Sequence, residues 1–259
     1  MQDDTIMVTG ASDGIGAVYA DRLARRGHRL VLVARRTERL EQVADRIRSA
    51  SRVAVEALVA DLGSPADLAR VEARLRDDET IAGLVNNAGM AGEGPIVSAE
   101  PALLTALVNL NVLAVTRLTA AIAPRLARQG RGTIINLGSV TSLMPGAFSS
   151  VYPATKAFVL AFTEALQAEL RPKGVRVQCV LPGVTRTAIW SDEQMSRLPP
   201  GMVMEAQDMV DAALAGLDRG ESVTIPSLPD IAVYQAYVAT RDELRPGLSL
   251  STPAPRYRT

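Results

Sequence analysis

The sequence contains very few of the residues that form disulfides and metal sites. It has one cysteine, Cys179, and one histidine, His28. A single cysteine cannot form an intramolecular disulfide, and a single histidine argues against a histidine-ligated zinc centre. We therefore predict no metal site and a cytoplasmic location. The acidic start, Met1-Gln2-Asp3-Asp4, also lacks the basic region of a secretory signal peptide.

The chain also lacks an excess of either charge. Lys and Arg number 28, as do Asp and Glu, so the formal net charge is zero. Nucleic-acid binders usually carry a basic excess, so we expect no nucleic-acid partner. The longest apolar stretch, 102–123, is interrupted by Asn109, Asn111 and Arg117, which are costly inside a bilayer. We interpret it as a buried or interface helix and expect no membrane partner.

Short β-branched runs alternate with longer amphipathic stretches. The predicted strands cover 5–9, 29–34, 53–59, 81–86, 132–138, 175–181 and 222–225. The predicted helices cover 15–26, 37–50, 65–76, 100–129, 150–171 and 205–218. This alternation predicts an α/β fold, a doubly wound seven-stranded parallel sheet with helices on both faces, in a single domain.

The main domain is predicted at 1–225. The segment 186–201 lacks periodicity and contains Pro199 and Pro200, so we predict a lid over 186–204. Five prolines fall in 226–259, which we interpret as an extension packed on the same domain, with a short helix near 230–240.

A glycine-rich run lies where the first strand turns into the first helix. The run from Thr9 to Gly16 has the pattern G-x-x-x-G-x-G. Glycines at such a turn let the backbone approach a pyrophosphate, which the free N–H groups and the helix dipole attract. The alternative is an ordinary glycine-rich turn, but the strand before and the helix after favour a dinucleotide site.

Basic residues follow the second strand, where an NAD site usually has a carboxylate for the ribose 2′-hydroxyl. Arg35 and Arg36 stand there instead, and guanidinium groups suit a 2′-phosphate, so NADP is predicted over NAD. The two arginines could also be a solvated pair. Asp61 and Leu62, after the third strand, would lie beside the adenine, although Asp61 could equally cap the next helix.

A tyrosine and a lysine, Tyr152 and Lys156, are four residues apart and share one face of a predicted helix. A cation about 4 Å from a phenol, at an effective dielectric of about 20, is worth about 4 kcal/mol, or about three pKa units. That lowers the expected pKa of the phenol toward neutrality, where a general acid or base works best. The alternative is a solvated helix pair.

The scarcity of lysine strengthens this interpretation. Of the 28 basic residues only Lys156 and Lys173 are lysines, so 26 are arginines. A lysine kept one turn from a tyrosine therefore indicates a need for a compact ammonium group. All five asparagines lie between 86 and 136, which indicates a role in backbone or site geometry. Ser139, just past the fifth strand, could donate a hydrogen bond to a substrate carbonyl or be a simple turn residue.

Together these motifs resemble the short-chain dehydrogenase/reductase family, in its compact single-domain branch with a Rossmann fold. The resemblance runs from Thr5 to about Ile225. It implies a catalytic tetrad of Asn111, Ser139, Tyr152 and Lys156. It also implies a cofactor site formed by Gly10, Ser12, Asp13, Gly14, Ile15, Gly16, Arg35, Arg36, Asp61, Leu62, Asn87, Ala88, Gly89, Tyr152, Lys156, Pro182, Gly183, Val184, Thr185 and Thr187. The sequence departs from the family at Asp13, where many NADP-preferring members have Ser, Arg or Lys.

The activity implied is reversible hydride transfer between the nicotinamide of NADP and a carbonyl carbon, with Tyr152 passing the proton. Lys156 would lower the pKa of Tyr152 and hold the ribose, Ser139 would orient the oxygen, and Asn111 would anchor a water. The resemblance also implies a homodimer or homotetramer formed through the helices at 100–129 and 150–171. A non-catalytic NADP-binding regulatory protein of the same fold is the alternative function.

Flexible apolar residues gather in or beside loops expected at the carboxyl edge of the sheet. They are Met90, Met144, Phe148, Trp190, Met195, Met202, Met204 and Met209. Such side chains suit an apolar ketone or secondary alcohol as substrate. Ordinary helix packing is the alternative, and Met209 is the member most suited to the core.

Overall fold

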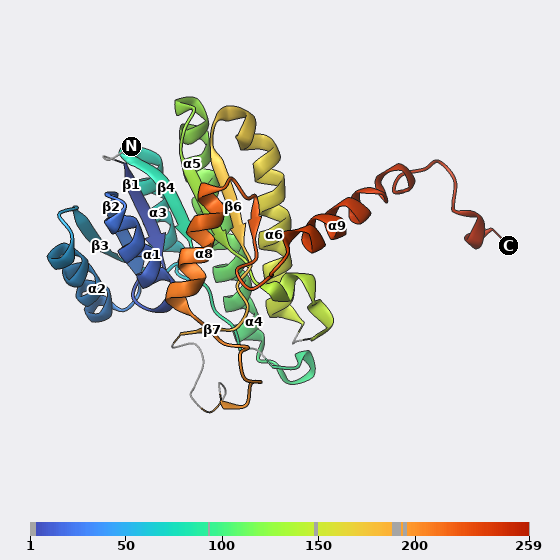
Figure 1. Ribbon diagram of the computed structural model, residues 1–259, viewed down its shortest axis with the longest axis horizontal. Coiled ribbons are helices and arrows are strands. Elements are labelled where there is room, and N and C mark those ends of the chain that lie inside the picture. Colours follow the sequence, from blue (N-terminus) through green and yellow to red (C-terminus); the bar gives the residue numbers. More distant parts are fainter. Residues whose placement is uncertain (1–3, 93, 148–149, 188–192, 194–195, 259) are drawn as a thin grey trace. The chain divides into compact units, whose positions relative to one another are not determined.

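The computed structural model describes residues 4–258 apart from 93, 148–149, 188–192 and 194–195. A seven-stranded sheet forms its centre (Figure 1). The strands are β1 (Thr5–Thr9), β2 (Arg29–Ala34), β3 (Val55–Val59), β4 (Ile81–Asn86), β5 (Thr133–Leu137), β6 (Arg176–Val180) and β9 (Val223–Thr224). Their order is β3-β2-β1-β4-β5-β6-β9, and every neighbouring pair is parallel. The predicted doubly wound fold is confirmed, and the strands are at most two residues shorter at either end than the sequence predicted.

Helices cover both faces of the sheet. They are α1 (Gly14–Arg25), α2 (Thr37–Ala50), α3 (Pro65–Asp77), α4 (Pro101–Val108), α5 (Val115–Gln129), α6 (Val151–Leu170) and α8 (Ala206–Asp218). Successive strand residues point to opposite faces, so each strand supplies two cores. Val8 and Leu32 pack with α1, α2 and α8, whereas Met7 and Val33 pack with α3, α5 and α6.

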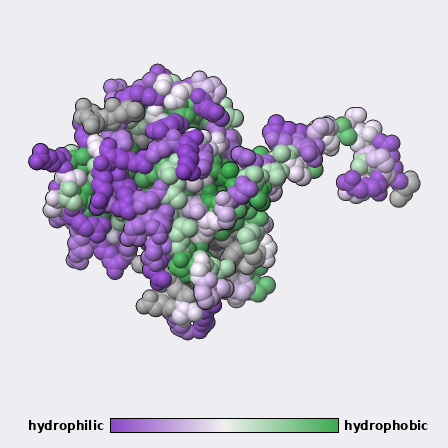
Figure 2. Space-filling model, viewed as in Figure 1, coloured by the Kyte–Doolittle hydropathy of each residue, from purple (hydrophilic) through white to green (hydrophobic). Residues whose placement is uncertain are grey.

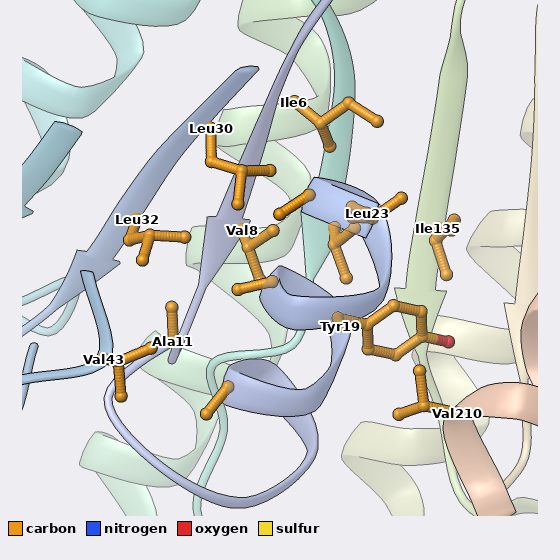
Figure 3. Close-up of a cluster of buried hydrophobic side chains, with 14 of the residues drawn as sticks. Ile6, Val8, Ala11, Tyr19, Leu23, Leu30, Leu32, Val43, Ile135 and Val210 are labelled. Carbon is orange, nitrogen blue, oxygen red and sulfur yellow. The ribbon is translucent and has the colours of Figure 1, made fainter. Parts of the chain in front are cut away.

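Tyr19 fills the centre of the first core. It is fully buried, and Figure 3 shows its ring between α1, Ile135 of β5 and Val210 of α8. Its hydroxyl has no hydrogen-bond partner among the described residues, and burial raises the pKa of this phenol above its ordinary value. Tyr19 is therefore a packing residue.

The predicted helix at 100–129 is not one continuous α-helix, so that prediction was wrong in its middle. Six residues, Asn109–Ala114, form a π-helical segment between α4 and α5. A π segment widens the helix by one residue and changes the direction of the side chains within it. The apolar pattern continues through the segment, and that is why the periodicity did not reveal it.

Among the residues that the structure describes, the same stretch also passes a length and composition test for a membrane span. Pro101–Gln129 has a window of mean hydropathy 1.6, of which 39% is buried. In the structure Leu118, Ile122 and Leu126 of α5 belong to the second core, and Arg117 pairs with Glu72 of α3. These contacts are those of a core helix.

Two short strands flank the predicted lid. β7 (Thr185–Arg186) and β8 (Met204–Glu205) pair in parallel and form a separate two-stranded sheet. Much of the lid lies at 188–192 and 194–195, outside the described residues, so its closing over a substrate stays a prediction.

The chain divides into two compact units at residues 226 and 227. The second unit, Ser227–Thr259, contains α9 (Ile231–Asp242), close to the short helix expected at 230–240. Asp230 caps α9 by accepting a hydrogen bond from the backbone N–H of Ala232. The packing of this extension on the main domain stays a prediction.

Candidate active site

The sheet has a switch point between β1 and β4, where the strand order reverses. In doubly wound sheets, ligands bind in the crevice that opens at such a point, beyond the carboxyl ends of the strands. The turn from Thr9 to Gly16 lies there, between β1 and α1. The sequence motif and the topology therefore indicate the same place.

The glycines of this turn are required by close backbone packing. A Cβ on Gly16 would lie 2.3 Å from the carbonyl oxygen of Gly10, and one on Gly10 would lie 2.7 Å from the Asn87 Nδ2 atom. Gly14 has a φ of +51°, and a Cβ there would lie 2.9 Å from the Thr187 side chain. Glycines thus keep the turn tight at the start of α1, where backbone N–H groups and the helix dipole attract a pyrophosphate, so the turn fits the predicted group.

Hydrogen bonds of Thr9, at the end of β1, and Asn87, just after β4, fix the glycine turn. The Thr9 hydroxyl donates to the Val85 carbonyl and accepts from the backbone N–H groups of Asn87 and Ala88, both at 3.0 Å. The Asn87 amide donates to the carbonyls of Thr9 and Gly10. Asn87 thus serves the geometry of the turn, and Thr9, the first residue of the predicted run, supports the turn although it was not among the predicted cofactor-binding residues.

Asp13 caps the first turn of α1. One of its oxygens, Oδ1, accepts a hydrogen bond of 2.7 Å from the Gly14 backbone N–H. Its other oxygen, Oδ2, lies 3.1 Å from Arg39 and 3.5 Å from Arg36. Arg36 also donates to Ser12, at 3.3 Å. Arg36 is therefore not a lone solvated residue, and it lies beside the glycine turn. Ile15, the next predicted member, packs against the first core.

The other residues predicted at the adenosine end are close by. Arg35 lies 3.8 Å from the Asp61 carboxylate, and both side chains are exposed. Asp61 does not cap α3, because Ser64 occupies that position; it instead accepts a hydrogen bond from the Gly63 backbone N–H. Leu62 is buried in the second core, so a contact of Leu62 with an adenine would have to use its backbone.

Two other asparagines belong to the sheet itself. Asn86 in β4 donates to Asn136 in β5 at 2.8 Å and to the Thr119 hydroxyl at 3.0 Å. Asn136 donates to the Thr163 hydroxyl. All four side chains are buried, and they connect β4 and β5 to the helices α5 and α6. The expectation that the asparagines serve internal geometry is confirmed for this pair.

Asn111 lies in the π-helical segment and is buried. Its Oδ1 accepts from the Met90 backbone N–H, while its Nδ2 donates to the Met90 carbonyl and the Thr155 hydroxyl. These bonds connect the loop after β4 to α6. Thr155 is a partner that the sequence did not indicate, although it immediately precedes Lys156.

Lys156 is buried in the same region, with 8% of its surface exposed. Its Nζ donates to the Leu137 carbonyl at 2.9 Å and lies 5.8 Å from the centre of the Tyr152 ring. The predicted proximity of the two side chains is confirmed. Burial lowers the pKa of Lys156 to about 8, because the charged amine is poorly solvated there. At neutral pH the group still carries its charge.

Gly89 shows how closely these residues converge. A Cβ on Gly89 would lie 3.2 Å from Asn111 Oδ1 and 3.6 Å from Lys156 Nζ. Ser139 lies two residues beyond the end of β5, and its buried hydroxyl oxygen accepts from the Thr141 backbone N–H. The short helix that follows Ser139, Val140–Leu143, packs on α6. The predicted tetrad is thus drawn from three neighbouring elements at one edge of the sheet.

Helix α6 begins without a side-chain cap. Ser150 occupies the N-cap position, but its side chain makes no capping hydrogen bond. Pro153 lies in the first turn, where a missing N–H costs nothing.

The loop after β6 carries the last predicted residues. The Pro182 carbonyl accepts from the Val140 N–H, and the Thr185 hydroxyl donates to the Gly183 carbonyl. The Val184 carbonyl accepts from Met204. Thr187 approaches Gly14, so this loop returns to the glycine turn.

The apolar residues predicted for the substrate pocket separate into groups. Met144 and Met202 are exposed, whereas Met209 is fully buried in the first core, as expected. Phe148, Trp190 and Met195 lie outside the described residues. Cys179 is buried, and burial raises the pKa of its thiol to about 12, which makes it an inert core residue.

The doubly wound sheet and the glycine turn define a dinucleotide-binding protein, and the residues beside the turn define an oxidoreductase-like site. Residues 4–197 match the family model described as short chain dehydrogenase. The chain therefore belongs to the short-chain dehydrogenase/reductase family.

Similar proteins give further detail. A solved short-chain dehydrogenase from Sphingobium yanoikuyae, in complex with NADPH, is 50% identical with a TM-score of 0.94, over 98% of this chain and 100% of that one. The bulky-bulky ketone specific alcohol dehydrogenase from Comamonas testosteroni is 44% identical, with a TM-score of 0.93 and full coverage of both chains.

A curated relative, very-long-chain 3-oxoacyl-CoA reductase-B of Danio rerio, is 35% identical over 187 residues, which are 71% of this chain. The human very-long-chain 3-oxoacyl-CoA reductase is also 35% identical over 187 residues. The match covers 60% of the length of these relatives.

Proposed function

We propose that this protein is an NADP-dependent oxidoreductase that transfers a hydride between the nicotinamide and a ketone or secondary alcohol. The observation that carries the proposal is the Tyr152–Lys156 pair, which lies with Asn111 and Gly89 beside the glycine turn. A phenol beside a buried amine is suited to acid–base chemistry on a carbonyl oxygen.

The residues present fit NADP. The glycine turn would hold the pyrophosphate, Lys156 the ribose, and the loop Pro182–Thr187 the carboxamide end. Arg35 and Arg36 offer guanidinium groups for a 2′-phosphate. The Sphingobium relative, which is 50% identical, is in complex with NADPH. When bound, the cofactor supplies or accepts the hydride.

The chain's own residues handle the proton. In the reductive direction Tyr152 donates its hydroxyl proton to the carbonyl oxygen as the negative charge develops there. The pKa of Lys156 is about 8, so at neutral pH its amine is protonated. The resulting ammonium group stabilises the phenolate. Ser139 orients the oxygen. Asn111 holds the loop after β4 against α6 and anchors the water through which Tyr152 regains a proton.

An apolar substrate fits the exposed Met144 and Met202, which are flexible and apolar. The Comamonas relative is described as specific for bulky-bulky ketones, which is the substrate class we propose. The test is a panel of ketones with NADPH. Turnover of aromatic and long-chain ketones is expected, and turnover restricted to highly charged ketones would overturn the apolar assignment.

The protein is further proposed to act in the cytoplasm as a homodimer or homotetramer. Val108 and Leu113 on the α4–α5 stretch and Phe158 on α6 are exposed apolar residues. These are the helices that family resemblance assigns to subunit pairing. Light scattering on the purified protein should give two or four times the 27.5 kDa chain mass. A 27.5 kDa particle at micromolar concentration would contradict the assembly.

The direct test of the function is Tyr152→Phe, which removes one hydroxyl. Turnover should fall at least about a hundredfold, the usual contribution of a general acid. NADPH binding, measured by calorimetry, should remain because the fold and the turn are unchanged. Tyr237→Phe, on exposed helix α9, is the matched control and should leave both unchanged. Tight NADPH binding without turnover of any carbonyl by the unaltered protein would instead favour a regulatory role.

A further inference from the structure

An ion-paired cluster lies beside the glycine turn and includes a residue that the sequence did not indicate. Asp13 Oδ2 is 3.1 Å from Arg39 Nη1 and 3.5 Å from Arg36 Nη2. Arg36 also donates to the Ser12 hydroxyl. Arg36 is the N-cap residue of α2 and Arg39 lies in the first turn of this helix, so one helix start places both guanidinium groups beside Asp13.

The cluster is open to solvent and to a ligand. The side chains of Arg36, Arg39 and Asp13 are between 40% and 54% exposed. A hollow of about 230 Å³ adjoins Asp13 and Arg39, and its lining also includes Ser12, Gln42 and Arg46. Figure 2 shows hydrophilic residues over the side of the molecule where α1 and α2 lie.

The two oxygens of Asp13 have separate partners. Oδ1 caps α1 through the Gly14 backbone N–H, and Oδ2 is the oxygen that faces both arginines. Its charge is therefore available to the arginines without loss of the cap. Exposed ion pairs of this kind are weak, so a stronger anion can replace the carboxylate. A phosphate monoester, with about two negative charges and three acceptor oxygens, is such an anion.

We propose that Asp13 is an internal counter-ion for Arg36 and Arg39, and that the 2′-phosphate of NADP displaces it and binds both guanidinium groups. Arg39 is then a specificity-determining residue, and Asp13 limits the preference for NADP over NAD. This inference rests on the proposed function. It also explains why the Asp13 carboxylate is tolerated beside the proposed 2′-phosphate site, where its negative charge would otherwise repel the phosphate.

The two residues have opposite expected effects. Arg39→Ala removes a guanidinium from the phosphate, so NADPH binding should weaken by about ten- to a hundredfold. Asp13→Asn keeps an oxygen for the Gly14 cap but removes the competing charge, so NADPH should bind about three- to tenfold tighter. NADH lacks the phosphate, and its affinity should change by less than about twofold in both variants.

The experiment is calorimetric titration of the full-length protein with NADPH, NADH, adenosine 2′,5′-bisphosphate and AMP at two salt concentrations. The bisphosphate and AMP differ in the 2′-phosphate alone, so they isolate the cluster from the nicotinamide end. Arg25→Ala is the matched control, because Arg25 pairs with Asp21 on α1. Circular dichroism checks folding, and Arg39→Lys provides a second variant that retains the charge.

The outcomes separate the two levels of the argument. If the unaltered protein binds neither dinucleotide, the proposed function fails. If it binds NADPH but Arg39→Ala binds NADPH as tightly, Arg39 has no role in specificity and this inference is wrong. If Asp13→Asn weakens NADPH binding, Asp13 positions the arginines for the phosphate and is not a competing counter-ion.

Discussion

Replacing the buried Lys156 by methionine should stabilise the folded protein at neutral pH. The ordinary pKa of a lysine is 10.5, and burial lowers that of Lys156 to about 8. This difference corresponds to about 3 kcal/mol, because one pKa unit is worth about 1.4 kcal/mol. The variant also loses the hydrogen bond to the Leu137 carbonyl, which lowers this stabilisation by about 1 kcal/mol. A net increase of about 2 kcal/mol in the free energy of unfolding is expected at pH 7.

The pH dependence gives the sharper test. Because the pKa is lower in the folded state, the unfolded state binds more protons between pH 8 and pH 10.5. The stability contribution of Lys156 therefore rises with pH across this window, and the cost of burying its charge is fully present below pH 8. By pH 9.5 the advantage of the methionine variant should fall below about 1 kcal/mol.

Urea unfolding of both proteins without nucleotide, at pH 7 and pH 9.5, measures these differences. Lys173→Met is the matched control, since Lys173 is exposed and its replacement should have the same small effect at both pH values. A methionine variant that is less stable at pH 7, or a stability difference that does not change with pH, would refute the reasoning. In either case burial would not be the dominant influence on Lys156.

Three further predictions concern the glycine turn and the cores. Gly16→Ala places a Cβ 2.3 Å from the Gly10 carbonyl oxygen, so calorimetry should show loss of NADPH binding, while unchanged affinity would contradict the packing argument. Tyr19→Phe removes a buried hydroxyl without a partner among the described residues and should raise stability by about 1 kcal/mol in urea unfolding; a decrease would mean that the hydroxyl is satisfied. Asn136→Ala removes one of the two acceptors of the buried Asn86 amide, the other being the Thr119 hydroxyl, and should cost about 2 kcal/mol in the same assay; a cost near zero would mean that the asparagine network does not contribute to stability.

Much of the fold could be predicted because strands and helices alternate with different periods. The strand at 29–34 was predicted with its observed bounds, since a β-branched run there is bounded by Gly27 and by charged residues. The Tyr152–Lys156 pair could be predicted as well, because four residues make one helical turn. The glycine turn needed only its flanking strand and helix.

Other features depend on contacts between distant segments and were missed. The π-helical segment at Asn109–Ala114 leaves the apolar pattern unchanged, so no period detects it. The sequence alone indicates only that Arg39 is a surface residue, because its partner Asp13 lies 26 residues away in the chain. Thr155 gains its role through Asn111, 44 residues earlier in the chain. The spacing of Arg36 and Arg39 was a signal that could have been used.

The widened turn that carries Asn111 makes this region sensitive to chain length as well as to side-chain identity. Each residue of an α-helix rotates the next by about 100°. Deleting one residue between 109 and 114 would restore a regular helix there, and the remaining side chains would be rotated relative to α5, which is fixed by its apolar residues. Even with every tetrad residue retained, the amide that bridges Met90 and Thr155 would then face elsewhere. A homologue can therefore keep all four tetrad residues and still be one residue shorter between 109 and 114. Such a homologue should be checked for loss of the Asn111 bridge between Met90 and Thr155 before it is assigned the same chemistry.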